Sequence, residues 1–142
     1  MLTRVLAATL VGGIAFFIVG FVVYGLILDP MVIKPNLVEF PGLMKEMPTM
    51  VPLILANFVS AFMLAYIFDR WGSISTFMGG MQAGAIIYLL IALSFQLMFI
   101  AFWNLFKNYI PPVADIIGST VMGAICGGVI GMMLGVMKKR EG

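Results

Sequence analysis

Apolar residues run through the chain in four long stretches separated by short polar segments. The stretches cover residues 5–28, 51–68, 77–106 and 113–137. A helix needs about 20 mainly apolar residues to cross a bilayer, and each stretch reaches or approaches that length. The pattern predicts an all-α fold: a polytopic membrane protein with a four-transmembrane-helix bundle, forming one transmembrane domain over residues 1–142.

Prolines mark two of the connections between these stretches. Residues 29–50 contain four of them, Pro30, Pro35, Pro41 and Pro48. Proline fixes φ and has no backbone N–H, so it interrupts a helix. We therefore expect residues 29–50 to form an external loop without a long helix. Pro111 and Pro112 likewise predict a break before the last stretch.

The composition excludes most soluble and catalytic classes. The chain is 63% hydrophobic and only 10% charged, too few charged residues to cover a soluble globule of 142 residues. Histidine is absent and Cys126 is the single cysteine, which removes Cys/His zinc sites and histidine-based triads. No basic domain is present to bind nucleic acid. We expect no enzymatic activity and no cofactor.

Positive charges indicate the orientation of the bundle. Five basic residues fall on the side of the two termini and three on the other side: Arg4, Arg70, Lys138, Lys139 and Arg140, against Lys34, Lys45 and Lys107. Lysine and arginine are enriched in short cytoplasmic segments. The distribution predicts that the N- and C-termini are cytoplasmic.

Small residues recur every four positions along the last stretch, at Ser119, Gly123, Gly127, Gly131 and Gly135. Such a glycine-zipper edge lets another helix approach closely, which is a main source of helix association in lipid. The partner helix can belong to the same chain or to another. Within the chain, the ring stripe Phe95, Phe99, Phe102 and Phe106 is one candidate, and the smaller motif Gly80 with Gly84 provides another close contact.

Polar side chains inside the stretches offer a second site. Asn57, Gln96 and either Ser119 or Thr120 are expected at similar depth in the outer half of the bundle. They predict either a polar path for a small neutral solute or ion, or hydrogen bonds that cross-link the helices.

Methionines in the external loop raise one metal hypothesis. Met44, Met47 and Met50 repeat every three residues, and thioethers are soft ligands that suit Cu(I). Thirteen methionines are scattered through the chain, however, and methionine is a common apolar gap filler. The sequence therefore favours no metal site.

The chain resembles small four-span bacterial inner-membrane proteins that are grouped only as a domain of unknown function. The resemblance rests on a glycine-bearing first span, a loop run, a short turn and the glycine-rich last span, with Tyr24, Gly25, Asp29, Met44, Lys45, Glu46, Met47, Pro48, Asp69 and Gly72 as its landmarks. It implies a multi-pass protein of the bacterial inner (plasma) membrane, and it implies no substrate or catalytic residue.

These patterns lead to two functional expectations. The first is a non-enzymatic membrane protein that assembles through the glycine-zipper edge, as a homo-oligomer or as a small subunit of a larger membrane complex. Its partners would be the lipid bilayer and either copies of itself or other membrane subunits. The alternative is a channel or transporter that uses the polar path. An enzyme acting on lipid comes third, since no general base is evident.

Overall fold

The computed structural model describes residues 1–142, and all of its regular elements are helical. Four helices are long and apolar enough to cross a membrane, which confirms the all-α fold with four candidate spans. They run over Leu2–Asn36, Met50–Gly72, Phe77–Phe102 and Ile110–Glu141.

The first helix is longer than the sequence predicts. The α-helix α1 (Leu2–Gly20) continues as a π-helix, η1 (Phe21–Ile33), and ends in a short 3-10 turn, η2 (Lys34–Asn36). The expectation of an irregular loop from residue 29 is therefore wrong as far as Asn36, although Pro30 lies inside the helix. A π-helical turn is wider than an α-helical one, and this widening relieves the clash between a proline ring and the preceding turn.

The second helix, α2 (Met50–Ile67), also ends in a π-helical segment, η3 (Phe68–Gly72). A tight turn follows, in which Ser73 adopts a left-handed conformation with φ of 49°. Thr76 then caps the next helix, because its hydroxyl accepts a hydrogen bond from the backbone N–H of Gly79 at 3.1 Å.

The third helix, α3 (Phe77–Phe102), ends before residue 106, where the apolar stretch ends. The reason is a competing backbone pairing with the first loop. The N–H of Val38 donates to the carbonyl of Leu105 at 2.8 Å, and the N–H of Lys107 donates to the carbonyl of Asn36 at 2.9 Å. These bonds require an extended backbone in place of another helical turn.

The fourth helix, α4 (Ile110–Glu141), begins three residues before the expected 113 and includes both prolines. Pro111 and Pro112 occupy its first turn, where backbone N–H groups have no partner within the helix. The two prolines therefore lie in the first turn of α4, and the break between the helices falls before them, at residues 103–109.

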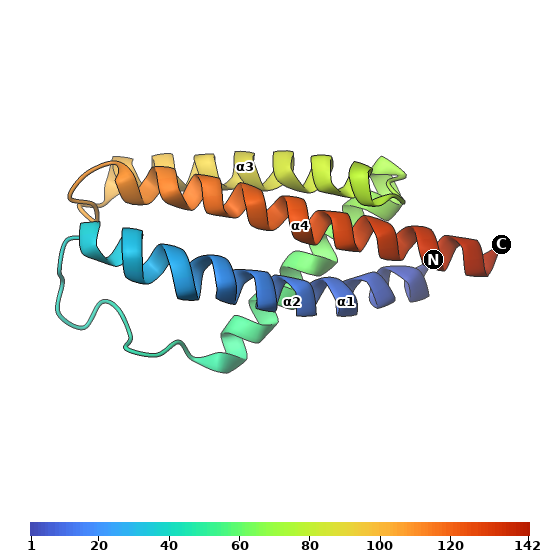
Figure 1. The fold of residues 1–142 in the computed structure, drawn as a ribbon, viewed down its shortest axis with the longest axis horizontal. Coiled ribbons are helices and arrows are strands. Elements are labelled where there is room, and N and C mark those ends of the chain that lie inside the picture. The colour runs from blue at the N-terminus through green and yellow to red at the C-terminus, as the bar shows by residue number, and fades with distance from the viewer.

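Helix α4 lies at the centre of the bundle and packs against each of the other three helices. In Figure 1, α3 and α4 lie side by side, α1 follows the other side of α4, and α2 crosses obliquely. Both termini lie at one end, here called the terminal end. The opposite end, here called the loop end, carries the connections 37–49 and 103–109.

Glycines set the distance between α3 and α4. A Cβ atom at Gly84 would overlap the carbonyl oxygen of Gly123, and one at Gly80 would overlap the carbonyl oxygen of Gly127. Gly131 likewise lies against the backbone of Gly80. We call this backbone-to-backbone interface the glycine contact.

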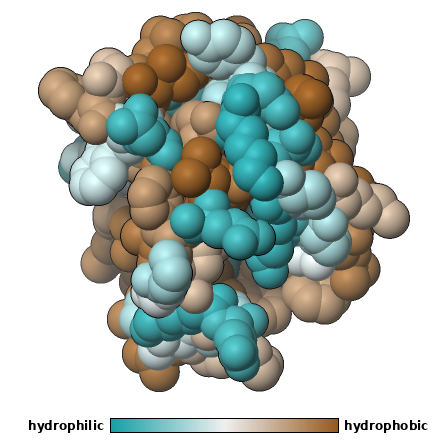
Figure 2. Space-filling model, turned by 90° about the vertical axis from the view of Figure 1, so that its left-hand side faces the viewer, coloured by the Kyte–Doolittle hydropathy of each residue, from teal (hydrophilic) through white to brown (hydrophobic).

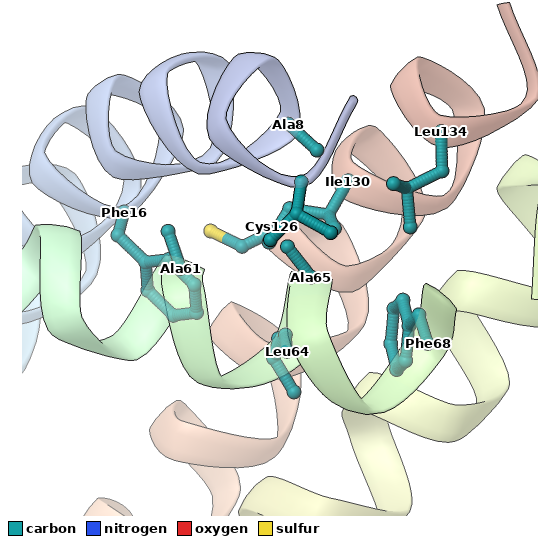
Figure 3. Close-up of a cluster of buried hydrophobic side chains, with 10 residues drawn as sticks. Ala8, Phe16, Ala61, Leu64, Ala65, Phe68, Cys126, Ile130 and Leu134 are labelled. Carbon is teal, nitrogen blue, oxygen red and sulfur yellow. The ribbon is translucent and has the colours of Figure 1, made fainter. Parts of the chain in front are cut away.

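The first helix, the second helix and α4 share one apolar core at the centre of the bundle. Figure 3 shows Ala8 and Phe16 of α1, Ala61 and Leu64 of α2, and Ile130 of α4 within one cluster. All five side chains are essentially inaccessible, and no polar or charged residue is buried with them. The core therefore closes the middle of the bundle without a polar opening.

The half of α2 nearest the loop end lies outside this core. Residues 50–56 are all exposed, whereas Ala61, Leu64 and Ala65 further along the helix are buried. The oblique path of α2 carries its first two turns away from the other helices (Figure 1).

The glycine contact leads to a prediction about stability. Gly84→Ala is expected to lower the free energy of unfolding by about 1–3 kcal/mol, because the new methyl group forces two backbones apart. Gly20→Ala is the control: its Cβ would lie 3.6 Å from the sulfur of Met122, an ordinary contact. Equilibrium unfolding in detergent measures both variants, and equal losses would contradict the assigned role of the contact.

Candidate functional site

The glycine-zipper edge of α4 is occupied by α3 of the same chain over most of its length. Gly123, Gly127 and Gly131 are buried in the glycine contact, and Gly135 faces the carbonyl oxygen of Ser75. Ser119 differs, because its hydroxyl meets Tyr24 of the first helix. The partner of the glycine-zipper edge in this structure is therefore a helix of the same chain.

The aromatic stripe on α3 does not fill this edge. Phe95 and Phe102 are 57% and 76% exposed, and Phe99 is also exposed. These rings, one of the candidate partners, therefore do not pack into the groove. Gly80 and Gly84 take their place, since only residues without side chains let the two backbones come so close.

Four polar side chains meet near the loop end and form what we call the polar cluster: Tyr24, Gln96, Asp115 and Ser119. The hydroxyl oxygen of Tyr24 lies 2.9 Å from Oδ1 of Asp115 and 2.7 Å from Oγ of Ser119. The amide Nε2 of Gln96 donates to Oδ2 of Asp115 at 2.7 Å. The cluster thus joins the first helix, α3 and α4.

The hydrogens of the polar cluster can be placed consistently. A tyrosine has one hydroxyl hydrogen, so Tyr24 donates to Asp115 and accepts from Ser119. Both oxygens of Asp115 then act as acceptors, the second one from Gln96. One buried atom is left over, because Oε1 of Gln96 has no hydrogen-bond partner.

The predicted polar path is not assembled as expected. Gln96 belongs to the polar cluster, but Nδ2 of Asn57 donates to the carbonyl of Leu53 on its own helix. Thr120 also bonds within its own helix, to the carbonyl of Ile116. The structure therefore does not bring Asn57, Gln96 and Thr120 together, whereas Ser119, the alternative to Thr120, joins Gln96 in the polar cluster.

Sequence reasoning missed Tyr24 and Asp115 as members of the site. Asp115 continues the four-residue series of Ser119 and Gly123 by one step toward the N-terminus, so its place on the inner face of α4 was available from the spacing. Tyr24 gave no such signal, because a tyrosine near the end of a predicted span is typical of an interfacial anchor.

A second group of charges lies at the terminal end. Nε of Arg4 is 2.6 Å from Oδ1 of Asp69, and Nη1 of Arg4 is 2.8 Å from Oε2 of Glu141. The side chain of Asp69 is only 8% exposed. Arg4 thereby ties the beginning of α1 to the end of the second helix and to the end of α4.

The three loop methionines lie at the loop end. Met44 and Met47 are in the connection 37–49, and Met50 begins α2; all three are exposed. The chain also contains no group of three or more His, Cys, Asp or Glu side chains that could hold a metal ion.

Comparisons with known proteins give no relative for this arrangement. No protein-family model, no curated protein sequence and no solved structure matches the chain. The resemblance to small four-span bacterial proteins therefore stays a prediction from the residues named above.

The polar cluster leads to a prediction for Tyr24. Tyr24→Phe is expected to lower the free energy of unfolding by about 0.6–2 kcal/mol, because Asp115 loses a donor and Ser119 an acceptor. Tyr109→Phe is the matched control, since Tyr109 is 71% exposed and lies outside the cluster. Equilibrium unfolding of the two variants compares them. If both variants are as stable as the unmodified protein, the cluster does not hold the bundle together.

Proposed function

We propose that this protein is a non-enzymatic, multi-pass protein of the bacterial inner membrane that functions by assembling with other membrane helices. The four apolar helices support insertion in a bilayer. The terminal end supports a cytoplasmic location of both termini, because Arg4, Arg70, Lys138, Lys139 and Arg140 gather there.

The contact surface that we propose is the exposed first half of α2. The glycine-zipper edge is covered by α3, so a partner could reach it only after the glycine contact had opened. Residues 50–56 need no such rearrangement, since they are exposed in the folded chain.

One observation carries this proposal: the side chain of Asn57. Its Nδ2 bonds to the carbonyl of Leu53, and its Oδ1 accepts no hydrogen bond from the chain. An unsatisfied polar group facing hydrocarbon costs several kcal/mol, and asparagine side chains associate across membrane helices. A helix from outside the chain would supply the missing donor.

The partner that we propose is a second copy of the same chain. A two-fold axis places the same residue of both copies at the centre of the contact. Asparagine suits this position, because its amide carries both donors and an acceptor and can pair with itself. Met50, Leu53 and Asn57 share one face of α2 and would line the interface.

Cysteine cross-linking tests this dimer. Cys126 is the only cysteine, so a Cys126→Ala background is free of thiols. In that background Leu53→Cys is expected to form a disulfide between two copies in the membrane. Leu55→Cys is the control on the opposite face: Leu55 is 59% exposed against 38% for Leu53, so accessibility alone would favour the control.

Adding Asn57→Leu to the Leu53→Cys variant is expected to weaken the dimer by about 1–2 kcal/mol and to reduce the cross-linked fraction. Equal cross-linking at positions 53 and 55 would contradict the proposed face. Native mass spectrometry of the gently extracted particle adds a second readout, in which a foreign subunit in place of the second copy would exclude the homodimer.

A second proposal is the passage of a small neutral solute or ion, and the polar cluster supports it. An ionisable side chain within a helix bundle commonly marks such a pathway. Asp115 lies there beside the unpartnered Oε1 of Gln96. The apolar core and the glycine contact lie between this cluster and the terminal end, so a pathway would require α3 and α4 to move apart.

Liposome flux tests the second proposal. If the cluster forms a path, Asp115→Asn and Gln96→Leu should each abolish flux, whereas Gln82→Leu, on an exposed position of α3, should leave it unchanged. The same flux in the Asp115 and Gln82 variants, or no flux above that of empty vesicles, would contradict a transport function.

A further inference from the structure

A cavity of about 720 Å³ lies at the loop end, between the connection 37–49 and the last turn of α3. Its volume falls within the range of small-molecule sites, roughly 300–1,000 Å³. Eight of its twelve lining residues are hydrophobic, among them Leu43, Phe99 and Trp103. We call it the loop cavity.

The walls of the loop cavity are held in place by hydrogen bonds. The two backbone bonds between residues 36–38 and 105–107 fix the start of the loop against the connection 103–109. Nδ2 of Asn108 also donates to Oδ1 of Asn36 at 2.9 Å. These bonds hold the first residues of the loop against the connection that follows α3.

The polar lining of the loop cavity is mainly cationic. Lys34 and Lys45 contribute ammonium groups, and Glu39 is the single acid. The ion pairs of the chain all lie at the terminal end, so neither lysine forms an ion pair with a carboxylate. Lys45 donates one hydrogen bond to Thr49 and keeps two further N–H donors.

The location of the loop cavity also restricts its ligand. It lies at the ends of the apolar helices, where Trp103 would occupy the interfacial depth that tryptophan prefers in membranes. Figure 2 shows this end of the molecule, where hydrophilic groups are interspersed with hydrophobic ones. A ligand that matches both properties has an acyl chain and an anionic headgroup.

We propose that the loop cavity binds an anionic phospholipid of the surrounding bilayer. Its acyl chain lies against Leu43, Phe99 and Trp103, and its phosphate binds Lys34 and Lys45. This inference relies on the membrane insertion proposed above, but not on the dimer.

Fluorescence quenching tests the proposal. The chain has two tryptophans, so Trp71→Phe leaves Trp103 in the loop cavity as the only reporter. This variant is reconstituted into phosphatidylcholine vesicles that contain a small fraction of lipid brominated on its acyl chains. Brominated phosphatidylglycerol is expected to quench Trp103 more strongly than the same fraction of brominated phosphatidylcholine.

The double variant Lys34→Gln with Lys45→Gln is expected to remove this preference. Two lysines account for a change of roughly thirtyfold in relative affinity for the anionic lipid. Lys138→Gln with Lys139→Gln removes the same charge at the terminal end and should retain the preference. Equal quenching by the two brominated lipids, or a preference that survives loss of Lys34 and Lys45, would overturn the proposal.

The Asn57→Leu variant separates this result from the assembly proposal. The loop cavity is formed by one chain, so the lipid preference should persist when the dimer is lost. A preference that disappears with Asn57→Leu would place the lipid between two copies and overturn the single-chain site.

Discussion

The contact between the backbones of α3 and α4 determines how the rest of the bundle is arranged. Gly80 and Gly84 meet Gly123 and Gly127 with no side chain between them. In the proposed bilayer setting, lipid would not drive helices together as water does, and this close packing would replace much of the hydrophobic effect. It fixes α4 against α3 and leaves the opposite face of α4 to α1 and α2, where Cys126, Ile130 and Leu134 complete the core (Figure 3).

Much of this arrangement could be predicted from the sequence. The apolar stretches correspond to the four helices in number and order, and the spacing of the small residues indicates which edge of α4 accepts a close neighbour. The partner of that edge was harder to identify, because the Phe95 stripe and the Gly80 motif lie on the same helix. The choice depends on how α3 rotates about its axis, and the sequence of α3 does not specify this.

The errors have two physical causes. Pro30 was expected to end a helix, but a proline can be accommodated when the turn around it widens, and a single sequence gives no sign of that. The start of α4 is the second cause, because the sequence predicts that this helix begins at residue 113, which leaves Asp115 in its first turn. The helix starts at Ile110, so Asp115 lies more than one turn inside, where it meets Tyr24 and Gln96. A shift of three residues in the start of α4 therefore moves Asp115 from the first turn of the helix into the polar cluster.

The central place of α4 also matters for the biogenesis of the protein. Ribosomes synthesise chains from the N-terminus, so α4 is made after the other three helices, although it packs against each of them. Until α4 is present, Phe16, Ala61 and Leu64 lack much of their final surroundings, and Gly84 has no backbone to meet. The bundle can therefore complete its packing only after α4 has been synthesised, and until then the first three helices lack the helix that packs against all of them.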